Sequence, residues 1–429
     1  MSHEFVSDTA VSRGLDPCLS RAFVLDVTTP MQTTLRIYLD HNATTGLSNE
    51  VKARVHAFLE EYGNPSSIHW AARGPKTVLR ETRQKIAQAL GVGPLEIIFT
   101  SGGSEGNNTI LKGVFEHLTI AETRDKWSGR HEFITTKLEH PSIMKSLQWL
   151  EKRGAVVHYL DVTREGRVDL DQYRRLLSAK TALVSVMFAN NETGVLFPIR
   201  QMVDLAHAAG ALFHSDCVQG LGKVPLNLSE LDVDYATFSA HKFYSLKGTG
   251  FIYVKKGSAY ENLIHGGGQE RQRRGGTENT VGIAALNTAL DRLSELESKV
   301  ASIGLMRDEF EARCLNEIPR MTITSGKALR VPNTSSLVIE GVDGETLLMS
   351  LDLKGFAVST GAACSSGNPE PSPVLLAIGL SREEAQSSLR VSLGWDTTRE
   401  EMESFFEALR AVVIRIRSIA SEGAEENVS

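Results

Sequence analysis

The chain has 429 residues, of which 41% are hydrophobic and 23% charged, and its formal net charge is −6. This length can bury a sizeable core and favours two domains, and the charge argues against broad binding to nucleic acid or to an anionic membrane. No apolar run is long enough to span a membrane, and the N-terminus lacks the apolar stretch of a secretory signal. The 4 cysteines form no paired C-x-x-C motif, so neither a metal site nor a disulfide framework is predicted, and a reducing cytoplasm fits best.

The first elements expected along the chain are two helices. Ser48 is a good N-cap for a helix that runs to about Tyr62, with Gly63 as its stop. Pro75 opens a second helix, which ends near Gly91.

Short apolar strands then alternate with helical segments. The strands are expected at residues 96–100, 133–135, 156–160, 183–188, 211–215, 235–239 and 251–254. This spacing is typical of βαβ crossovers, so we predict an α/β fold with a mostly parallel, doubly wound sheet. Ligand sites in such sheets lie at the carboxyl ends of the strands.

The C-terminal part of the chain mixes further strands and helices. The segments are expected at residues 335–340, 345–351, 390–393 and 400–419. They predict a second, smaller α+β domain, and the polar tail after Ser421 is expected to fray.

The stretch Ser239-Ala240-His241-Lys242 ends one of these strands and precedes a glycine-rich segment. A lysine there, beside small donors that could hold an anion, can form a Schiff base if its amine is partly desolvated and neutral. Taken alone, such a stretch more often contains an ordinary surface lysine. Upstream, however, Asp216 and Gln219 are residues that a pyridoxal phosphate ring would need, because a carboxylate beside the ring nitrogen keeps it protonated.

The run Thr100-Ser-Gly-Gly-Ser104 follows a strand and opens a helix. Small residues let backbone N–H groups approach a phosphate, and the helix dipole favours an anion. An ordinary turn between strand and helix is the alternative. The chain contains neither a P-loop nor a dinucleotide fingerprint, which argues against a nucleotide site.

Cys364 lies in a run of small residues with glycine and proline, residues 359–369. This composition is typical of a mobile loop, and no apolar neighbours surround the thiol, so we predict a reactive cysteine. Cys217 follows an apolar strand and is expected to be inert, as are Cys18 and Cys314.

Further motifs lie in register with these, from Tyr38 to about Trp395. The blocks are residues 38–45, 63–67, 99–105, 139–142, 190–194, 216–223, 239–242, 266–270, 274–279 and 359–367. Together and in this order they resemble the cysteine desulfurases of the NifS/IscS type, which are pyridoxal-phosphate enzymes with the class V aminotransferase fold.

The resemblance implies fold type I of the pyridoxal-phosphate-dependent transferases. In that family the segment near Tyr38 joins the small domain, so we expect a small domain of residues 34–46 and 291–429. Residues 47–290 would form the large, cofactor-binding domain. Residues 1–33 are expected to be a poorly ordered extension.

The resemblance also implies which residues hold the cofactor. They are Gly103, Ser104, His140, Asn191, Asp216, Gln219, Ser239, His241, Lys242 and Thr277. Lys242 would bind pyridoxal 5'-phosphate covalently, and Gln219 would bond the phenolic oxygen of the ring. Thr277 would reach the phosphate from a second subunit, so a homodimer is implied.

Substrate and catalysis are assigned in the same way. The substrate-binding residues are expected to be Asn42, Asn191 and Arg390. A guanidinium suits a carboxylate because it binds bidentately, although a surface ion pair is the alternative for Arg390. Lys242 would act as acid and base, His140 would stack on the ring and take the substrate's thiol proton, and Cys364 would take the sulfur. A lone histidine such as His140 is more often structural.

The sequence departs from the family pattern at two places after Ser239. Ala240 replaces a glycine, and Ser245-Leu246 replace a Gly-Pro pair. Neither removes a group with a chemical role, but they leave open the conformation after Lys242.

The implied reaction converts L-cysteine to L-alanine and leaves a persulfide on Cys364, which supplies an iron–sulfur scaffold or a thiolation enzyme. Alternatives are a selenocysteine lyase or another class V enzyme, of which an aminotransferase has no use for Cys364. A non-catalytic, cofactor-binding assembly subunit is the alternative from another class. The joint presence of Lys242, Asp216, His140 and Cys364 argues against that subunit.

Overall fold

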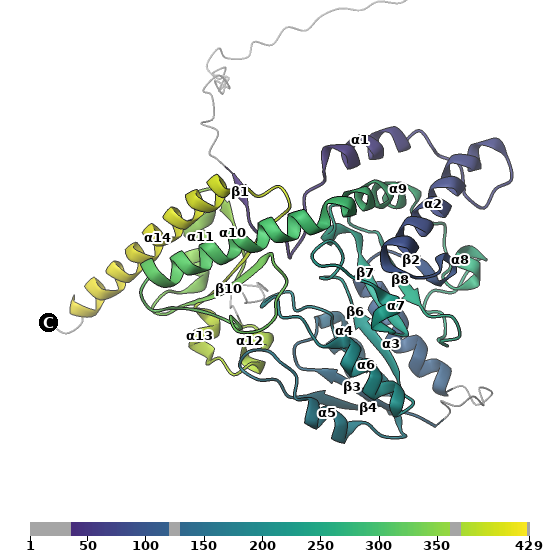
Figure 1. The fold of residues 1–429 in the computed structure, drawn as a ribbon, viewed down its shortest axis with the longest axis horizontal. Coiled ribbons are helices and arrows are strands. Elements are labelled where there is room, and N and C mark those ends of the chain that lie inside the picture. The colour runs from purple at the N-terminus through teal and green to yellow at the C-terminus, as the bar shows by residue number, and fades with distance from the viewer. Residues whose placement is uncertain (1–35, 120–128, 361–369, 427–429) are drawn as a thin grey trace, which may run out of the picture. The chain divides into compact units, whose positions relative to one another are not determined.

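The computed structural model of the chain describes residues 36–119, 129–360 and 370–426 (Figure 1). The part from Arg36 onward belongs to one compact unit. The predicted N-terminal extension, residues 1–33, lies outside the described residues, as does Cys364.

The two N-terminal helices are confirmed, with shifted ends. Helix α1 (Asn49–Phe58) begins after Ser48, whose side chain accepts the amide of Val51, and it ends before Tyr62. Tyr62 is 80% exposed, so no buried contact extends the helix to it. Helix α2 (Arg73–Leu90) ends at Gly91, which has a left-handed φ of 69°.

The main sheet of the described chain has 7 strands in the order β2-β8-β7-β6-β5-β3-β4. Their bounds are β2 Ile97–Thr100, β3 Glu132–Thr136, β4 Val156–Leu160, β5 Thr181–Ser185, β6 Leu212–Asp216, β7 Tyr235–Ser239 and β8 Gly250–Val254. Among these described strands only β8 runs in the opposite direction to the others, which confirms the predicted, mostly parallel sheet.

Helices cover both faces of this sheet (Figure 1). Successive side chains of a strand point to opposite faces of the sheet, and in β2 the side chains on both faces are apolar and need helices to cover them. Ile98 packs in the core with α3 (Gly103–Thr119) and α4 (Pro141–Glu151). Its neighbours Ile97 and Phe99 belong to the larger core, together with residues of α2, of α6 (Ile199–Ala208) and of α9 (Thr280–Ala289). A strand that is buried on both faces reads as a continuous apolar run, as predicted.

The C-terminal part contains two small sheets with helices packed on them. Strands β9 (Met321–Ile323), β10 (Thr334–Ile339) and β12 (Ser388–Ser392) form an antiparallel sheet, and β1 (Ile37–Tyr38) pairs with β11 (Phe356–Ala357). The helices of this part are α10 (Leu296–Glu317), α11 (Gly344–Asp352), α12 (Pro373–Ala377), α13 (Arg382–Gln386) and α14 (Arg399–Glu426). The short helices α5 (Leu170–Leu176), α7 (Leu228–Leu231) and α8 (Gln269–Gln272) belong to the part of the chain that carries the main sheet.

Two sequence-based expectations bear on this part. The β1–β11 pairing brings the N-terminal segment against the C-terminal part, as the proposed small domain of residues 34–46 and 291–429 requires. The exact domain division stays a prediction. The chain was expected to fray after Ser421, and in the structure α14 extends to Glu426.

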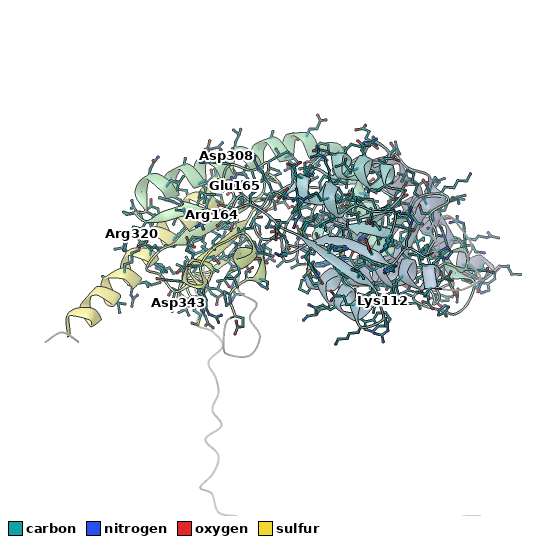
Figure 2. All side chains as sticks on the ribbon, turned by 90° about the horizontal axis from the view of Figure 1, so that it is seen from below. Lys112, Arg164, Glu165, Asp308, Arg320 and Asp343 are labelled. Atoms are coloured by element: carbon teal, nitrogen blue, oxygen red, sulfur yellow. The ribbon has the colours of Figure 1, made fainter. Side chains whose placement is uncertain are left out.

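Charged side chains tie the turn after β4 to the C-terminal part. Arg164 donates to the carbonyl oxygen of Gly379 at 2.8 Å and to Glu384 at 2.7 Å. Glu165 accepts the amide of Lys327 at 3.0 Å. Figure 2 labels Arg164 and Glu165 where these two regions meet. Within the described ranges, no helix is both long and apolar enough to cross a bilayer.

Candidate active site

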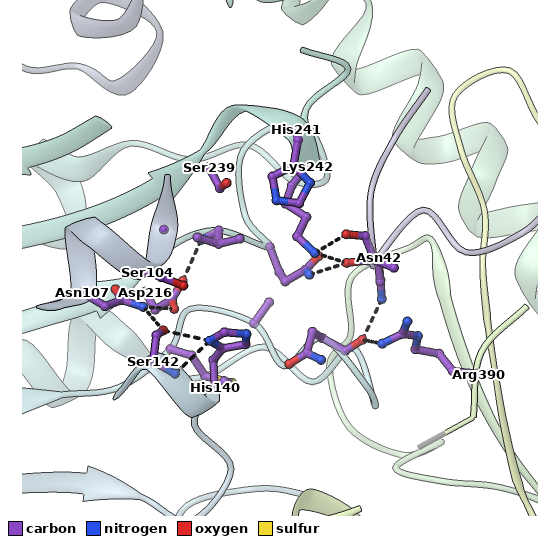
Figure 3. Close-up of a pocket in the computed structure, with 17 residues that line it drawn as sticks. Asn42, Ser104, Asn107, His140, Ser142, Asp216, Ser239, His241, Lys242 and Arg390 are labelled. Atoms are coloured by element: carbon purple, nitrogen blue, oxygen red, sulfur yellow. Dashed lines mark hydrogen bonds between the residues drawn. The ribbon is translucent and has the colours of Figure 1, made fainter. Parts of the chain in front are cut away.

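A cavity of about 360 Å³ lies at the carboxyl ends of the parallel strands, where the fold predicts a ligand site (Figure 3). It collects most of the residues that the sequence singled out. They are Asn42, Gly103, Ser104, His140, Asn191, Asp216, Gln219, Ser239, His241, Lys242 and Arg390.

Thr277 is the described site residue that the cavity does not include. Its side chain is exposed, and it lines a separate hollow of about 100 Å³ together with Ser101 and Arg274. Thr277 therefore does not contribute to the cavity of its own chain.

One end of the cavity is built to hold an anion. Gly102, at a φ of 150°, and Gly103 lead into α3, whose first N–H groups have no partner within the helix. A Cβ atom on Gly103 would lie 2.9 Å from Cγ2 of Val218, so only glycine leaves this approach open. Ser104 and Ser239 add hydroxyl groups on the cavity wall. A phosphate fits here, because helix N-termini favour anions.

Lys242 follows β7 in a short turn, residues Ala240–Lys242. Its Nζ atom donates to the carbonyl oxygens of Asn42 and Ala43, both at 2.6 Å (Figure 3). Burial first, and then the positive charge of Arg390, lower the pKa of Lys242 to about 8, against the raising effects of Asp40 and Asp216. Part of the amine is therefore neutral near neutral pH, which a nucleophilic lysine requires.

The conformation after Lys242, which the sequence left open, is fixed by Tyr244. This residue has a left-handed φ of 53°, which is strained for an aromatic side chain. The Tyr244 amide donates to Thr45 Oγ1 at 2.7 Å, and its hydroxyl accepts the amide of Trp395 at 2.7 Å. The guanidinium of Arg292 lies 4.5 Å from the ring centre. These contacts hold the turn without the glycine and proline found in the family.

A hydrogen-bond chain joins Asp216 to His140 (Figure 3). Asn107 donates from Nδ2 to Asp216 Oδ2 at 2.7 Å and to Ser142 Oγ at 2.8 Å. Ser142 Oγ lies 2.8 Å from His140 Nδ1, which also accepts the Ser142 amide at 3.1 Å. His140 is thus the N-cap of α4, and because Nδ1 accepts, the neutral ring carries its proton at Nε2.

The charge state of His140 and His241 follows from their surroundings. Burial lowers the pKa of His140, and Lys242 lowers it further, against the raising effect of Asp216. Burial and the charges of Lys242 and Lys247 lower the pKa of His241 to about 4. Both rings are therefore neutral hydrogen-bonding groups near neutral pH.

Arg390 forms a buried ion pair, which replaces the surface ion pair considered as its alternative role. It is 7% exposed, and it donates to Asp40 Oδ1 at 2.7 Å and to the carbonyl oxygen of Asn191 at 3.1 Å. Each of these bonds uses one hydrogen of a terminal nitrogen, so Nη1 and Nη2 each keep a second donor for a ligand in the cavity that Arg390 lines.

The side chain of Asn42 is already engaged within the protein. Its Nδ2 atom donates to the carbonyl oxygen of Asn191 at 3.0 Å and to Thr334 Oγ1 at 2.8 Å. Its Oδ1 atom accepts from Lys223 at 2.5 Å and from Asn333 at 3.1 Å. Asn42 therefore joins the cavity wall to the C-terminal sheet.

The sequence analysis assigned no role to Asn107 or to Lys223. Asn107 lies one helical turn after Gly103, and Lys223 lies one turn after Gln219, and this spacing is the one local signal for either. Cys217 and Cys314 were predicted to be inert, and both are fully buried free thiols. Burial raises the pKa of each thiol, which suppresses the reactive thiolate.

Glu139 is a buried carboxyl next to the cavity wall. Its oxygens accept from the amide of Met187, at 3.1 Å each, and from Thr136 Oγ1 at 2.8 Å. Burial raises the pKa of Glu139 to about 8, against the lowering effect of these bonds. Because the pKa of Glu139 is higher in the folded protein than in the unfolded chain, protonation of Glu139 stabilises the fold. This contribution to the free energy of unfolding is fully present below about pH 4.5, and it is lost as the pH rises to about 8.

Glu139→Gln is therefore expected to leave stability at pH 5 nearly unchanged and to stabilise the protein at pH 9, on the order of 1–4 kcal/mol. Thermal unfolding measured across this pH range checks it, with the exposed Glu60→Gln as the control. Parallel pH profiles for the Glu139 variant and the unaltered protein would contradict the assignment.

Comparison with known proteins agrees with this fold. The family model "Aminotransferase class-V" matches residues 37–405. The cysteine desulfurase IscS of Dictyoglomus turgidum is 41% identical over 386 residues, which cover 90% of this chain and 96% of that protein. The cysteine desulfurase NifS of Azotobacter vinelandii is 38% identical over 387 residues, covering 90% of this chain and 94% of that protein.

Among solved structures, a NifS-like protein matches with a TM-score of 0.81 and 35% identity, covering 88% of this chain and 99% of its own. The chain therefore belongs to the class-V aminotransferase family. Within that family, its relatives place it among the cysteine desulfurases of the NifS/IscS type.

Proposed function

We propose that this cysteine desulfurase takes the sulfur atom of L-cysteine, releases L-alanine and leaves the sulfur as a persulfide on Cys364. The observation that supports it most is that one cavity of about 360 Å³ joins Lys242, Asp216 and the N-terminus of α3. These are an amine that is partly neutral, a carboxylate and an anion site, which is the set that pyridoxal phosphate requires.

Pyridoxal 5'-phosphate is the proposed cofactor. The residues proposed to hold it are Gly103, Ser104, His140, Asn191, Asp216, Gln219, Ser239, His241 and Lys242 of one chain, with Thr277 from a second. When bound, the cofactor withdraws electrons from the carbon atoms of the substrate. Asn107 and the amide of Val218 donate to the two oxygens of Asp216, at 2.7 and 3.0 Å, and so fix the orientation of its carboxyl group in the cavity.

Substrate binding is proposed for Arg390 and Asn191, with Asn42 behind them. The unpaired donors of Arg390 suit the α-carboxylate of cysteine, because a guanidinium binds a carboxylate bidentately. The ion pair with Asp40 and the bond to Asn191 orient that guanidinium. Asn42, whose amide is engaged on both sides, acts by fixing Asn191 and the resting position of Lys242.

Proton transfer is proposed for Lys242, which takes the Cα proton of the substrate and later returns a proton as an acid. A pKa of about 8 for Lys242 suits both tasks. His140 presents its Nε2 proton, so it can hold the substrate's sulfur as a hydrogen-bond donor. For the His140 ring to take the thiol proton, its Nδ1 atom must first stop accepting the hydrogen bond from the backbone amide of Ser142.

Sulfur transfer balances without an added oxidant. The thiolate of Cys364 forms a sulfur–sulfur bond with the substrate's sulfur as the bond from that sulfur to Cβ breaks. The electron pair of the broken bond stays with the carbon, which gains a proton and becomes the methyl group of alanine. The thiolate is the attacking form because it is the nucleophile.

We also propose a homodimer. Thr277 is exposed and absent from the cavity of its own chain, so a second chain could supply it. The segment between α1 and α2 exposes large apolar side chains, which is typical of an interface. They are Leu59 at 60%, Tyr62 at 80%, Ile68 at 98% and Trp70 at 70%.

The persulfide is proposed to supply an iron–sulfur scaffold protein or a thiolation enzyme in the cytoplasm. The reducing cytoplasm suits this chemistry, since both cysteines of the described residues are free thiols.

Purified protein given L-cysteine and dithiothreitol is expected to release alanine and sulfide in equal amounts and to be yellow from its cofactor. Amino acid analysis and a sulfide assay measure the two products. Formation of pyruvate and ammonia in place of alanine would contradict the proposal, because it would show elimination and not sulfur transfer.

A further inference from the structure

Lys223 is a buried lysine in the wall behind the cavity, and no step above uses it. It follows Gln219 by one turn and is 7% exposed. Its Nζ atom donates to Asn42 Oδ1 at 2.5 Å and also to Gln219 Oε1. Both acceptors are neutral side-chain amides of residues that line the cavity.

The surroundings of Lys223 make an amine costly at this position. Burial lowers its pKa well below the usual value, and Lys242 and Arg390 lower it further, while Asp40 opposes them. His41 is the other titratable neighbour, and Lys223 lowers the pKa of its ring in turn. A methionine would fill this space without the penalty of burying an amine, so filling space does not account for a lysine.

The two bonds of Lys223 determine which way two amides face. An amide group presents an oxygen acceptor on one side and N–H donors on the other. Because Lys223 occupies Gln219 Oε1, the donor Nε2 points away from it, bonds the carbonyl oxygen of Asn42 at 3.0 Å and keeps a second hydrogen. The charged amine has three donors and no acceptor, so if the amide turned over, Nε2 would face it donor to donor.

We infer that Lys223 is a positioning residue that locks the amide of Gln219 with its donor toward the cavity. The ligand group it prepares for is an anionic ring oxygen, such as the phenolate of pyridoxal phosphate, so this inference rests on the proposed function. Without Lys223, Gln219 can present its oxygen to that anion, and a favourable contact becomes a repulsive one. Lys223 also fixes Asn42, whose carbonyl oxygen is shared by Gln219 and Lys242.

The test titrates pyridoxal phosphate into the full chain after its cofactor has been removed. Lys223→Met is expected to weaken binding roughly 10-fold to 100-fold, the effect of losing a hydrogen bond to a charged group. In the background of Gln219→Met, the same change is expected to weaken binding less than about 3-fold, because the amide it orients is gone. Visible spectra recorded against pH form a second readout, in which Lys223→Met raises the pKa of the bound chromophore.

Controls separate positioning from folding. Lys85→Met removes a lysine that also bonds an amide side chain, Asn287 Oδ1 at 3.1 Å, away from the cavity, and it is expected to leave binding unchanged. If Lys223→Met does not fold, Lys223→Gln retains a donor and is expected to bind within about 10-fold of the unaltered protein.

Equal weakening by Lys223→Met with and without Gln219 would overturn the inference, as would unchanged binding and spectra. A chain that binds no pyridoxal phosphate even when unaltered would instead contradict the proposed function.

Discussion

Lys242→Ala is expected to give a colourless protein that releases no detectable sulfide from L-cysteine. The variant loses the amine that would hold the cofactor and also the acid–base group, and the latter alone is worth roughly 10²–10⁴-fold in rate. The visible spectrum of the purified protein and the sulfide assay measure the two losses.

The fold should survive this substitution. The amine's partners are the carbonyl oxygens of Asn42 and Ala43, and leaving them unpaired costs about 1–3 kcal/mol. Circular dichroism checks the fold, and Lys256→Ala, which alters an exposed lysine, is the matched control. A Lys242→Ala protein that keeps its colour and its sulfide release would remove the residue from the mechanism.

Cys364→Ala is expected to keep the yellow colour and to lose sulfide release completely, because the thiol accepts the sulfur but does not hold the cofactor. A loss of sulfide release without a loss of colour distinguishes the role of Cys364 from that of Lys242. Absorbance and sulfide measurements on the same sample check it.

The matched control is Cys314→Ala, which removes a thiol that is buried in the C-terminal core and is expected to retain activity. If Cys364→Ala released sulfide at the normal rate, sulfur would leave the substrate without a persulfide on this residue.

The sequence predicted the elements whose pattern is local. The bounds of β4 and β7 were predicted exactly, because each is a short segment rich in β-branched and aromatic residues. The turn at Gly103 and the lysine at the end of β7 were likewise predictable, because each motif is contiguous and follows a strand.

What the sequence did not predict depends on contacts between distant segments. Asn42 meets Lys223 and Thr334, which lie far from it along the chain, and no periodicity encodes such a meeting. The chain from Asp216 to His140 passes through Asn107, an ordinary polar residue within a helical pattern. His140 precedes α4 and caps it, because its Nδ1 atom accepts the amide of Ser142, and no periodicity in the sequence predicts this role.

The left-handed backbone at Tyr244 had no local signal either. A tyrosine at a φ of 53° is unfavourable by itself. Hydrogen bonds to Thr45 and from Trp395, which are far from Tyr244 along the chain, stabilise this conformation. The structure of the turn after Lys242 is thus set by tertiary contacts that replace the missing glycine and proline.

The most direct test of the account is a single turnover without reductant, followed by mass spectrometry of the peptide that contains Cys364. We expect that peptide to gain the mass of one sulfur atom, with one alanine released for each sulfur bound and no gain on Cys217 or Cys314. Release of alanine while Cys364 stays unmodified would contradict sulfur transfer to this residue.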